Sequence, residues 1–142
     1  MAEAVKRRAP AQEAWELLGK LFGETRHRIV RVSAEFGLTP PQLFALRTLE
    51  PDEPVPMRAL ATALHCDSSN VTGLVDGLEA QGLVERRGAE HDRRVRMLVV
   101  TEHGAQVRSR LIEVMREVPP QLASLSAEDQ RALRDVLRRA LG

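Results

Sequence analysis

The 142-residue chain has few aromatic side chains and almost no cysteine, and each shortage excludes a class of protein. Tyrosine is absent, and the one cysteine, Cys66, cannot form a disulfide within the chain, which excludes a small disulfide-held scaffold. No apolar run reaches the roughly 20 residues that a membrane-spanning helix needs. The first residues lack the apolar segment of a signal peptide. We expect a cytoplasmic protein that does not contact membranes.

Motifs for catalysis and metal binding are also absent from the sequence. It contains no phosphate-binding glycine loop, no Gly-x-Ser-x-Gly and no histidine–carboxylate grouping with a local signature. The histidines are scattered, and none forms a closely spaced pair of metal ligands. We therefore expect neither an enzyme nor a protein with a metal or another cofactor.

Charge is balanced over the whole chain but not along it. The formal net charge is only +1, which excludes a globally basic, histone-like protein. Residues 86–96 alone carry +3, because five arginines there stand against Glu90 and Asp92. A chain of this length is one domain of ordinary size that can bury a core.

The segment after Asp67 predicts a helix with one apolar face. Asp67 is suited to the N-cap, where its carboxylate can accept hydrogen bonds from free amides. Gly82 is suited to the left-handed residue that follows a helix end. Between them, apolar residues recur at helical spacing, namely Val71, Leu74, Val75 and Leu78.

An arginine-rich hairpin should follow this helix. Residues 83–87 and 94–100 favour strands, and residues 88–92 supply the turn between them. The helix would fit the major groove of DNA, and the basic hairpin could reach phosphates or the minor groove. This order of elements is typical of a winged helix-turn-helix.

The same segment resembles the MarR-type transcriptional regulators. Asp92-Arg93-Arg94, the run MLVVT at residues 97–101 and Gly104 match that family's wing signature. Residues 69–84 match its recognition helix and first wing strand. The order and length of segments agree over almost the whole chain. The resemblance implies a DNA-binding transcriptional regulator.

Two glycines in the predicted recognition helix depart from the family pattern. Relatives often carry arginine or another long polar residue where Gly73 and Gly77 stand, so major-groove readout should be weaker here. Each glycine costs up to about 1 kcal/mol relative to alanine in a helix, which indicates either a close approach or sequence drift. Asp76, on the same helix, should pair with a nearby arginine or accept from a cytosine amine.

The segments before the recognition helix predict three more helices. Residues 11–36 form a long amphipathic pattern that Gly37 closes. A capping box of Thr39 and Gln42 starts a second helix that ends near Leu49. A loop then leads into a third helix that Pro56 opens.

Two helices should follow the hairpin. Thr101 caps a helix over about residues 102–118, which Pro119 and Pro120 end. Ser126 starts the last helix.

The expected fold is mainly α with a small antiparallel β-hairpin wing. Residues 11–142 should form one MarR-type domain, preceded by a flexible N-terminus at residues 1–10. The winged-helix lobe should span about residues 39–101, with dimerisation helices at about 11–36 and 102–142. These flanking helices carry apolar faces without a lobe of their own, so we expect burial between two chains. The competing interpretation is that they fold back onto the lobe of a monomer.

A homodimer would place two recognition helices about 34 Å apart, at successive major grooves on one face of double-stranded DNA. The expected function is a dimeric repressor of a pseudo-palindromic operator, released by a small aromatic or phenolic effector. Two alternatives stay open. One is a winged-helix architectural or docking adaptor with weak or non-specific DNA binding. The other is an oxidant sensor through Cys66, which competes with a role for Cys66 as a small buried residue.

DNA contacts are expected from the early recognition helix and from the wing. The resemblance assigns Arg94 the minor-groove or phosphate contact, and Asp92 the bracing of that side chain. Arg86 should pair with Glu85 or Glu90. Two competing interpretations involve no DNA. Residues 68–70 would only form a favourable first helical turn, and the wing arginines would be a solvated charge run. The predicted DNA-binding residues are Ser68, Ser69, Asn70, Thr72, Arg87, Arg93, Arg94 and Arg96.

The resemblance also implies an effector cleft between the dimerisation helices and the winged lobe. Aromatic and methionine side chains would line it, and an arginine would bind a carboxylate. The competing interpretation is that these are core positions. The candidate residues are Trp15, Phe22, Arg26, His27, Phe44, Arg47 and Met115.

Overall fold

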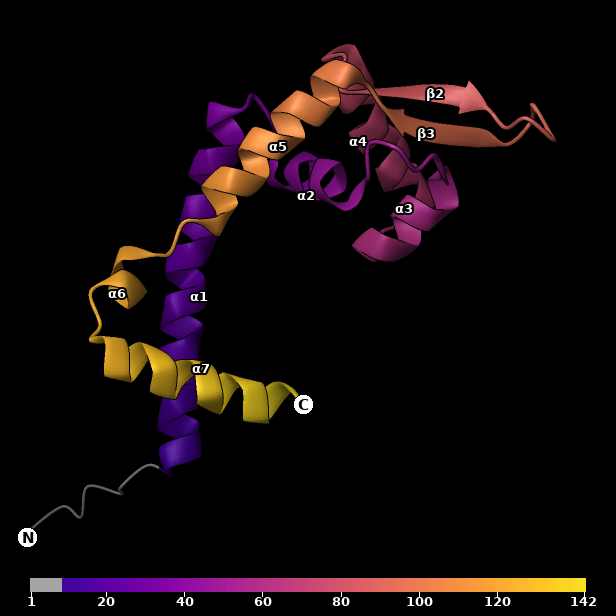
Figure 1. The fold of residues 1–142 in the computed structure, drawn as a ribbon. Helices are drawn as coiled ribbons and strands as arrows, with labels where there is room; N and C mark the ends of the chain where they lie inside the picture. Colours follow the sequence, from indigo (N-terminus) through magenta and orange to yellow (C-terminus); the bar gives the residue numbers. More distant parts are fainter. Residues whose placement is uncertain (1–8) are drawn as a thin grey trace, which may run out of the picture.

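The computed structural model describes residues 9–142, which form a winged helix-turn-helix lobe on a long helical stem (Figure 1). Residues 1–8, most of the segment predicted to be flexible, lie outside the described residues. The described elements are α1 (Pro10–Glu35), α2 (Pro40–Thr48), β1 (Val55–Pro56), α3 (Met57–Leu64), α4 (Ser68–Ala80), β2 (Val84–Gly88), β3 (Arg96–Val100), α5 (Glu102–Arg116), α6 (Pro120–Ala123) and α7 (Ala127–Leu141). None of these helices is long and apolar enough to cross a membrane. The prediction of a mainly α fold with a small antiparallel wing is confirmed.

Two local signals set the junction between α1 and α2. Gly37 has a φ of +67°, a left-handed conformation that glycine adopts readily, and α1 ends just before it. Thr39 accepts a hydrogen bond from the Gln42 backbone, and its own N–H donates to the Gln42 side chain at 2.9 Å. The predicted capping box is therefore confirmed, with Pro40 as the first residue of α2.

A tight turn joins α3 to α4 and completes the helix-turn-helix. His65 has a φ of +52° and ends α3 in the left-handed conformation. Asp67 occupies the predicted N-cap of α4, but its side chain makes no capping hydrogen bond, so that part of the prediction is wrong. The turn is held by the backbone, where the Cys66 N–H donates to the Ala61 carbonyl at 3.0 Å. Gly82 follows α4 with a φ of +70°, as predicted.

The wing belongs to a three-stranded antiparallel sheet in the order β1-β3-β2. In β1, Val55 pairs with Leu98 and Pro56 pairs with Met97. This segment was predicted to be a loop, and that prediction is wrong. Two residues, one of them proline, are too few to show the alternation that indicates a strand.

The turn of the wing is longer than predicted. β3 begins at Arg96 rather than at Arg94. The Val95 N–H donates to the Asp92 carbonyl at 3.0 Å, and the Ala89 N–H donates to the Val95 carbonyl at 2.9 Å. These bonds draw the chain around Asp92 into a compact turn, so the residues that follow it cannot join the ladder until Arg96.

The core lies between α2, α3, α4, α5 and the sheet, where apolar faces of all these elements meet. Its most deeply buried large side chains are Leu43, Leu46, Leu60, Val71, Val75, Leu78, Val84, Leu98 and Leu111. Of the apolar face predicted for the recognition helix, Val71, Val75 and Leu78 are confirmed as core, whereas Leu74 is half-buried and lines a pocket.

Two largely buried arginines tie α5 to the helices beside it. Arg28 of α1 donates to the carbonyls of Val114 and Glu117 at 2.6 and 2.7 Å, at the C-terminal end of α5. Arg108 of α5 donates to the Arg47 carbonyl at 3.2 Å, near the end of α2. Carbonyls in the last turn of a helix have no partner within the helix, and a cation there is favourable. These contacts connect the stem to the lobe.

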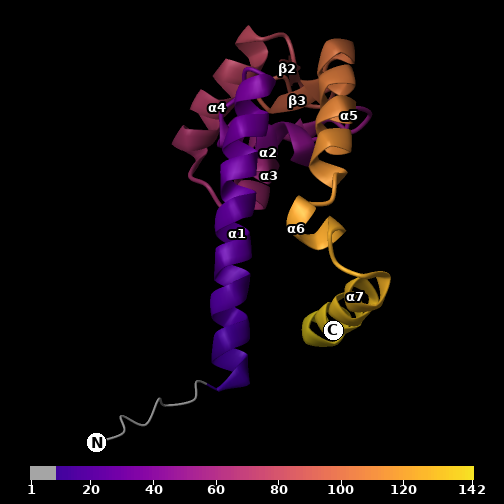
Figure 2. The same cartoon turned by 90° about the vertical axis from the view of Figure 1, so that its left-hand side faces the viewer.

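The chain after α5 leaves the lobe. α5 ends at Arg116, slightly earlier than predicted, and α6 was not predicted because four residues are too few to show a helical period. Ser126 accepts from the Asp129 N–H at 3.1 Å and starts α7, as predicted. α7 has no buried residue and extends away from the lobe (Figures 1 and 2).

We expect Gly104→Ala to destabilise the fold. A Cβ on Gly104 would lie 1.9 Å from the Leu83 carbonyl oxygen, so the backbone at the start of the wing would have to shift. Overpacking of this kind costs about 1–3 kcal/mol. Gly73→Ala is the matched control, because a Cβ there would meet nothing within 4 Å. That change should stabilise α4 by up to about 1 kcal/mol.

Urea unfolding at one protein concentration measures both changes. Equal free energies of unfolding for Gly104→Ala and the unaltered chain would contradict the packing argument.

Candidate nucleic-acid interface

The wing carries an exposed cluster of arginines. β2 and β3 project from the lobe, and the turn between them lies at the end farthest from α1 (Figure 1). Arg87 lies on β2, Arg93 and Arg94 lie in the turn, and Arg96 begins β3. All four are exposed. A projecting basic hairpin is a shape that reaches phosphates or enters the minor groove.

Asp92 fixes the turn that carries Arg94, although not in the predicted manner. Its carboxylate accepts a hydrogen bond from the Arg94 backbone N–H at 2.9 Å. We had expected it to hold the guanidinium. A carboxylate two residues before an N–H closes a local turn of the Asx type, so the backbone is braced instead. The Arg94 side chain is therefore presented to solvent from an ordered turn.

Arg87 pairs within its own strand. Its Nε and Nη2 atoms lie 3.0 and 2.7 Å from Glu85 Oε2. Both side chains are more than half exposed, and such surface pairs contribute only about 0–1 kcal/mol. A DNA phosphate could replace Glu85 at little cost, so Arg87 stays a candidate contact.

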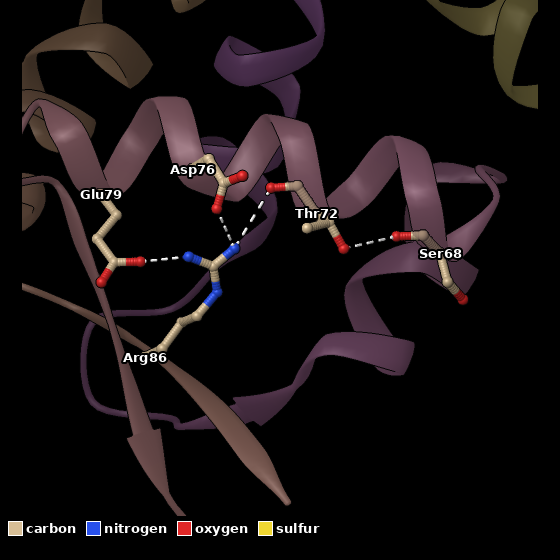
Figure 3. A network of polar contacts seen from close by, with 5 residues as sticks. All are labelled: Ser68, Thr72, Asp76, Glu79 and Arg86. Carbon is tan, nitrogen blue, oxygen red and sulfur yellow. Dashed lines mark hydrogen bonds and ion pairs between the residues drawn. The ribbon is translucent and has the colours of Figure 1, made fainter.

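Arg86 points toward α4 (Figure 3). Its Nη2 donates to Asp76 at 2.6 Å and to the Thr72 carbonyl at 3.3 Å, and its Nη1 donates to Glu79 at 2.5 Å. Burial lowers the pKa of the Arg86 guanidinium, but the hydrogen bonds and charges of Asp76 and Glu79 outweigh burial and raise that pKa above its ordinary value. Arg86 is thus a permanently charged link between β2 and α4.

These contacts correct one prediction and settle another. Arg86 was expected to pair with Glu85 or Glu90, and both partners are wrong. Adjacent residues on a strand point to opposite faces, so Glu85 lies on the side of Arg87 and not of Arg86. The prediction that Asp76 pairs with an arginine is confirmed. The i, i+3 spacing of Asp76 and Glu79 was the sequence signal for this cluster, and sequence reasoning missed it.

The first turns of α4 carry the polar residues that were predicted to contact DNA. Ser68, Ser69, Asn70 and Thr72 are all exposed. The Thr72 hydroxyl donates to the Ser68 carbonyl at 3.0 Å, which leaves its oxygen able to accept from a base or a bound water. All four side chains are therefore open to solvent, although they point in different directions around the helix axis.

The two glycines of α4 differ in their surroundings. A Cβ on Gly77 would lie 2.1 Å from Nε2 of Gln42, the residue that caps α2. The space beside Gly77 is therefore filled by the Gln42 side chain of the neighbouring helix, which would have to move if Gly77 carried a side chain. Gly73 faces open space, and nothing in the structure explains it.

The predicted effector residues do not share one cavity among residues 9–142. Trp15 and Phe22 project from α1 and are 72% and 61% exposed. His27 lines a pocket of about 220 Å³ between α1 and the start of α6. Phe44 lines a separate pocket of about 410 Å³ formed by α2, α3 and α4. Of the remaining candidates, Arg26 and Arg47 are exposed and Met115 packs against the core.

Cys66 lies half-buried beside the pocket that Phe44 lines. Its thiol donates to the Leu64 carbonyl at 3.3 Å, and the side chain packs against the core. In the described part of the chain, no group of three or more histidine, cysteine, aspartate or glutamate residues could hold a metal ion.

Comparisons with known proteins agree with this geometry. A model of the MarR family matches residues 38–95, which include α2 to α4 and the first strand and turn of the wing. The HTH-type transcriptional regulator YdgJ of Bacillus subtilis is 31% identical over 128 residues, covering 89% of this chain and 78% of the relative. The transcriptional repressor MprA of Escherichia coli is also 31% identical over 128 residues, covering 83% of this chain and 67% of the relative.

Among solved structures, the transcriptional regulator Tm0710 from Thermotoga maritima superimposes with a TM-score of 0.70 at 29% identity. That match covers 92% of this chain and 93% of the other. The chain therefore belongs to the MarR family and is a winged helix-turn-helix, DNA-binding regulator of transcription rather than an enzyme.

Proposed function

We propose that this regulator binds a pseudo-palindromic operator as a homodimer and represses transcription by occupying it. The observation that carries the dimer is the set of large apolar side chains exposed on the helices outside the lobe. Trp15 is 72% exposed, Phe22 61% and Leu141 85%. Apolar surface in water is unfavourable roughly in proportion to its area, and patches of this kind mark interfaces. Contact with a second copy of the chain is the simplest way to bury these apolar side chains.

The hollow formed by α6 and α7 supports the same proposal. Its volume is about 730 Å³, and its apolar lining comes from Val118, Leu122, Leu125, Leu133, Leu137 and Leu141. An amphipathic helix is a suitable occupant for an apolar groove of this kind. The exposed face of α1 in a second copy would supply such a helix.

Two-fold symmetry then sets the DNA geometry. The two α4 helices would enter major grooves about 34 Å apart. Ser68, Ser69, Asn70 and Thr72 would contact base edges or phosphates there. Arg94 would reach the minor groove or phosphates, and the other predicted wing arginines would contact the backbone.

Repression and its release complete the proposal. The MprA relative is named a repressor, which supports that sign of regulation. A small effector would release the operator by favouring a dimer in which the two α4 helices no longer match the groove spacing. The effector candidates lie apart in one chain, so a shared site would need surface from the second copy.

Arg94→Ala should weaken operator binding by about 1–3 kcal/mol, because a direct arginine contact is lost. The slope of log affinity against log salt should become shallower by about 1. Fluorescence anisotropy at several salt concentrations measures both. Arg116→Ala on α5 removes the same charge away from the wing and should bind like the unaltered chain. Full affinity of Arg94→Ala at physiological salt would refute the wing assignment.

Removing residues 126–142 should convert the dimer to a monomer, since α7 would be lost, whereas removing residues 1–9 should not. Leu137→Glu should act like the deletion by placing a charge in the apolar groove, and Arg131→Glu on the same helix is its control. Sedimentation velocity reports the assembly state. A stable dimer in both the deletion and Leu137→Glu would overturn the interface.

A further inference from the structure

We propose that Arg86 is a positioning residue that fixes α4 against the wing and so sets operator selectivity without touching DNA. The inference rests on the function proposed above, because selectivity is defined on the operator. It assigns Arg86 a role different from that of the exposed wing arginines.

The geometry places one guanidinium across two elements. Arg86 lies on β2, and its three partners Thr72, Asp76 and Glu79 lie on α4 (Figure 3). Spacings of four and three residues put these partners on one stripe of the helix. Ser68 lies one turn earlier on that stripe, bonded to Thr72. Arg86 therefore holds the stripe that carries two of the proposed DNA contacts.

The rest of α4 offers few other directional contacts to hold its orientation. Its buried face is apolar, and apolar contacts have little directional preference. The Asp67 side chain makes no capping hydrogen bond at its start. Gly73 has no side chain that could pack. A guanidinium that donates to three acceptors on one helix is the kind of contact that fixes both the rotation of that helix and its position along its axis.

Arg86 is also sheltered enough for these bonds to matter. Its side chain is 21% exposed, compared with 62% for Arg87 on the same strand. Because its Nη1 and Nη2 atoms donate to acceptors on α4, the guanidinium is directed at α4 rather than at a phosphate. The two carboxylates that it binds would otherwise repel DNA, and one positive charge offsets only one of them.

The expected consequence is that α4 and the wing approach DNA as one body. A base contact from α4 and a minor-groove contact from Arg94 can then be made together only on a site of the right geometry. Loosening the link would let each part bind separately, which favours non-specific DNA.

The sharpest test is the double variant Asp76→Asn with Glu79→Gln. It makes the DNA-facing surface more positive by two charges, so electrostatics alone predicts tighter binding to every DNA. Positioning predicts the opposite for selectivity, with the ratio of operator to non-specific affinity falling at least about tenfold. Glu90→Gln in the wing turn is the control, because it adds one charge outside the Arg86 cluster and should leave the ratio unchanged.

Two variants of Arg86 provide the second readout. Arg86→Met keeps the apolar stem and should lower the ratio with an unchanged salt slope, since no phosphate contact is lost. Arg86→Lys can bind one carboxylate at a time and should recover part of the ratio. Hydrogen exchange should quicken in residues 72–80 of Arg86→Met, and a thermal melt checks that its fold persists.

The outcomes separate this inference from the function on which it rests. If the unaltered chain selects no operator, the proposed function fails and this inference fails with it. If the unaltered chain is selective and the double variant keeps its ratio, or the salt slope of Arg86→Met becomes shallower as for a direct contact, this inference alone is overturned.

Discussion

The rotation of α4 about its own axis is the constraint on which the rest of the structure depends. Val71, Val75 and Leu78 are each at most 1% exposed, and they turn one face of α4 toward the core. Each residue along a helix turns by about 100°, so the side opposite this face carries Ser69 and Gly73, while Ser68 and Thr72 lie beside the face and are exposed. The same rotation brings Gly77 against α2 and Asp76 toward the wing. Apolar packing thus sets which side of α4 faces the core, and the proposed role of Arg86 is to fix the exact orientation of the helix within that limit.

Arginine serves two different purposes in this chain, and its surroundings separate them. Arg28, Arg86 and Arg108 have side chains that are 17%, 21% and 14% exposed, and each joins one element to another. The wing arginines are exposed and lie on the projecting hairpin of β2 and β3. A guanidinium suits both purposes, because its planar fork binds carbonyls and carboxylates inside the protein as well as phosphates outside. The overall charge of +1 therefore reveals little about where DNA binds.

Features set by neighbouring residues could be predicted from the sequence, and features set by tertiary contact could not. The capping box of Thr39 and Gln42 and the left-handed Gly82 depend on a few adjacent residues, and they appear as expected. β1 exists only because β3 lies beside it. The partners of Arg86 lie on another element, and the effector candidates fall into separate places because helical spacing says nothing about which helices meet. The wing turn is an intermediate case. Its position was predicted from the sequence, but the hydrogen bond from the Arg94 N–H to the Asp92 carboxylate was not.

The most direct measurement is a selection of genomic fragments with purified protein, repeated at two salt concentrations. Shape and base contacts should add to phosphate attraction. One pseudo-palindrome, with half-sites about one helical turn apart, should therefore be enriched at both salt concentrations. Enrichment without sequence preference that disappears steeply at the higher salt would show that phosphate contacts act alone. That result would contradict the account and favour an architectural or docking role for the winged lobe.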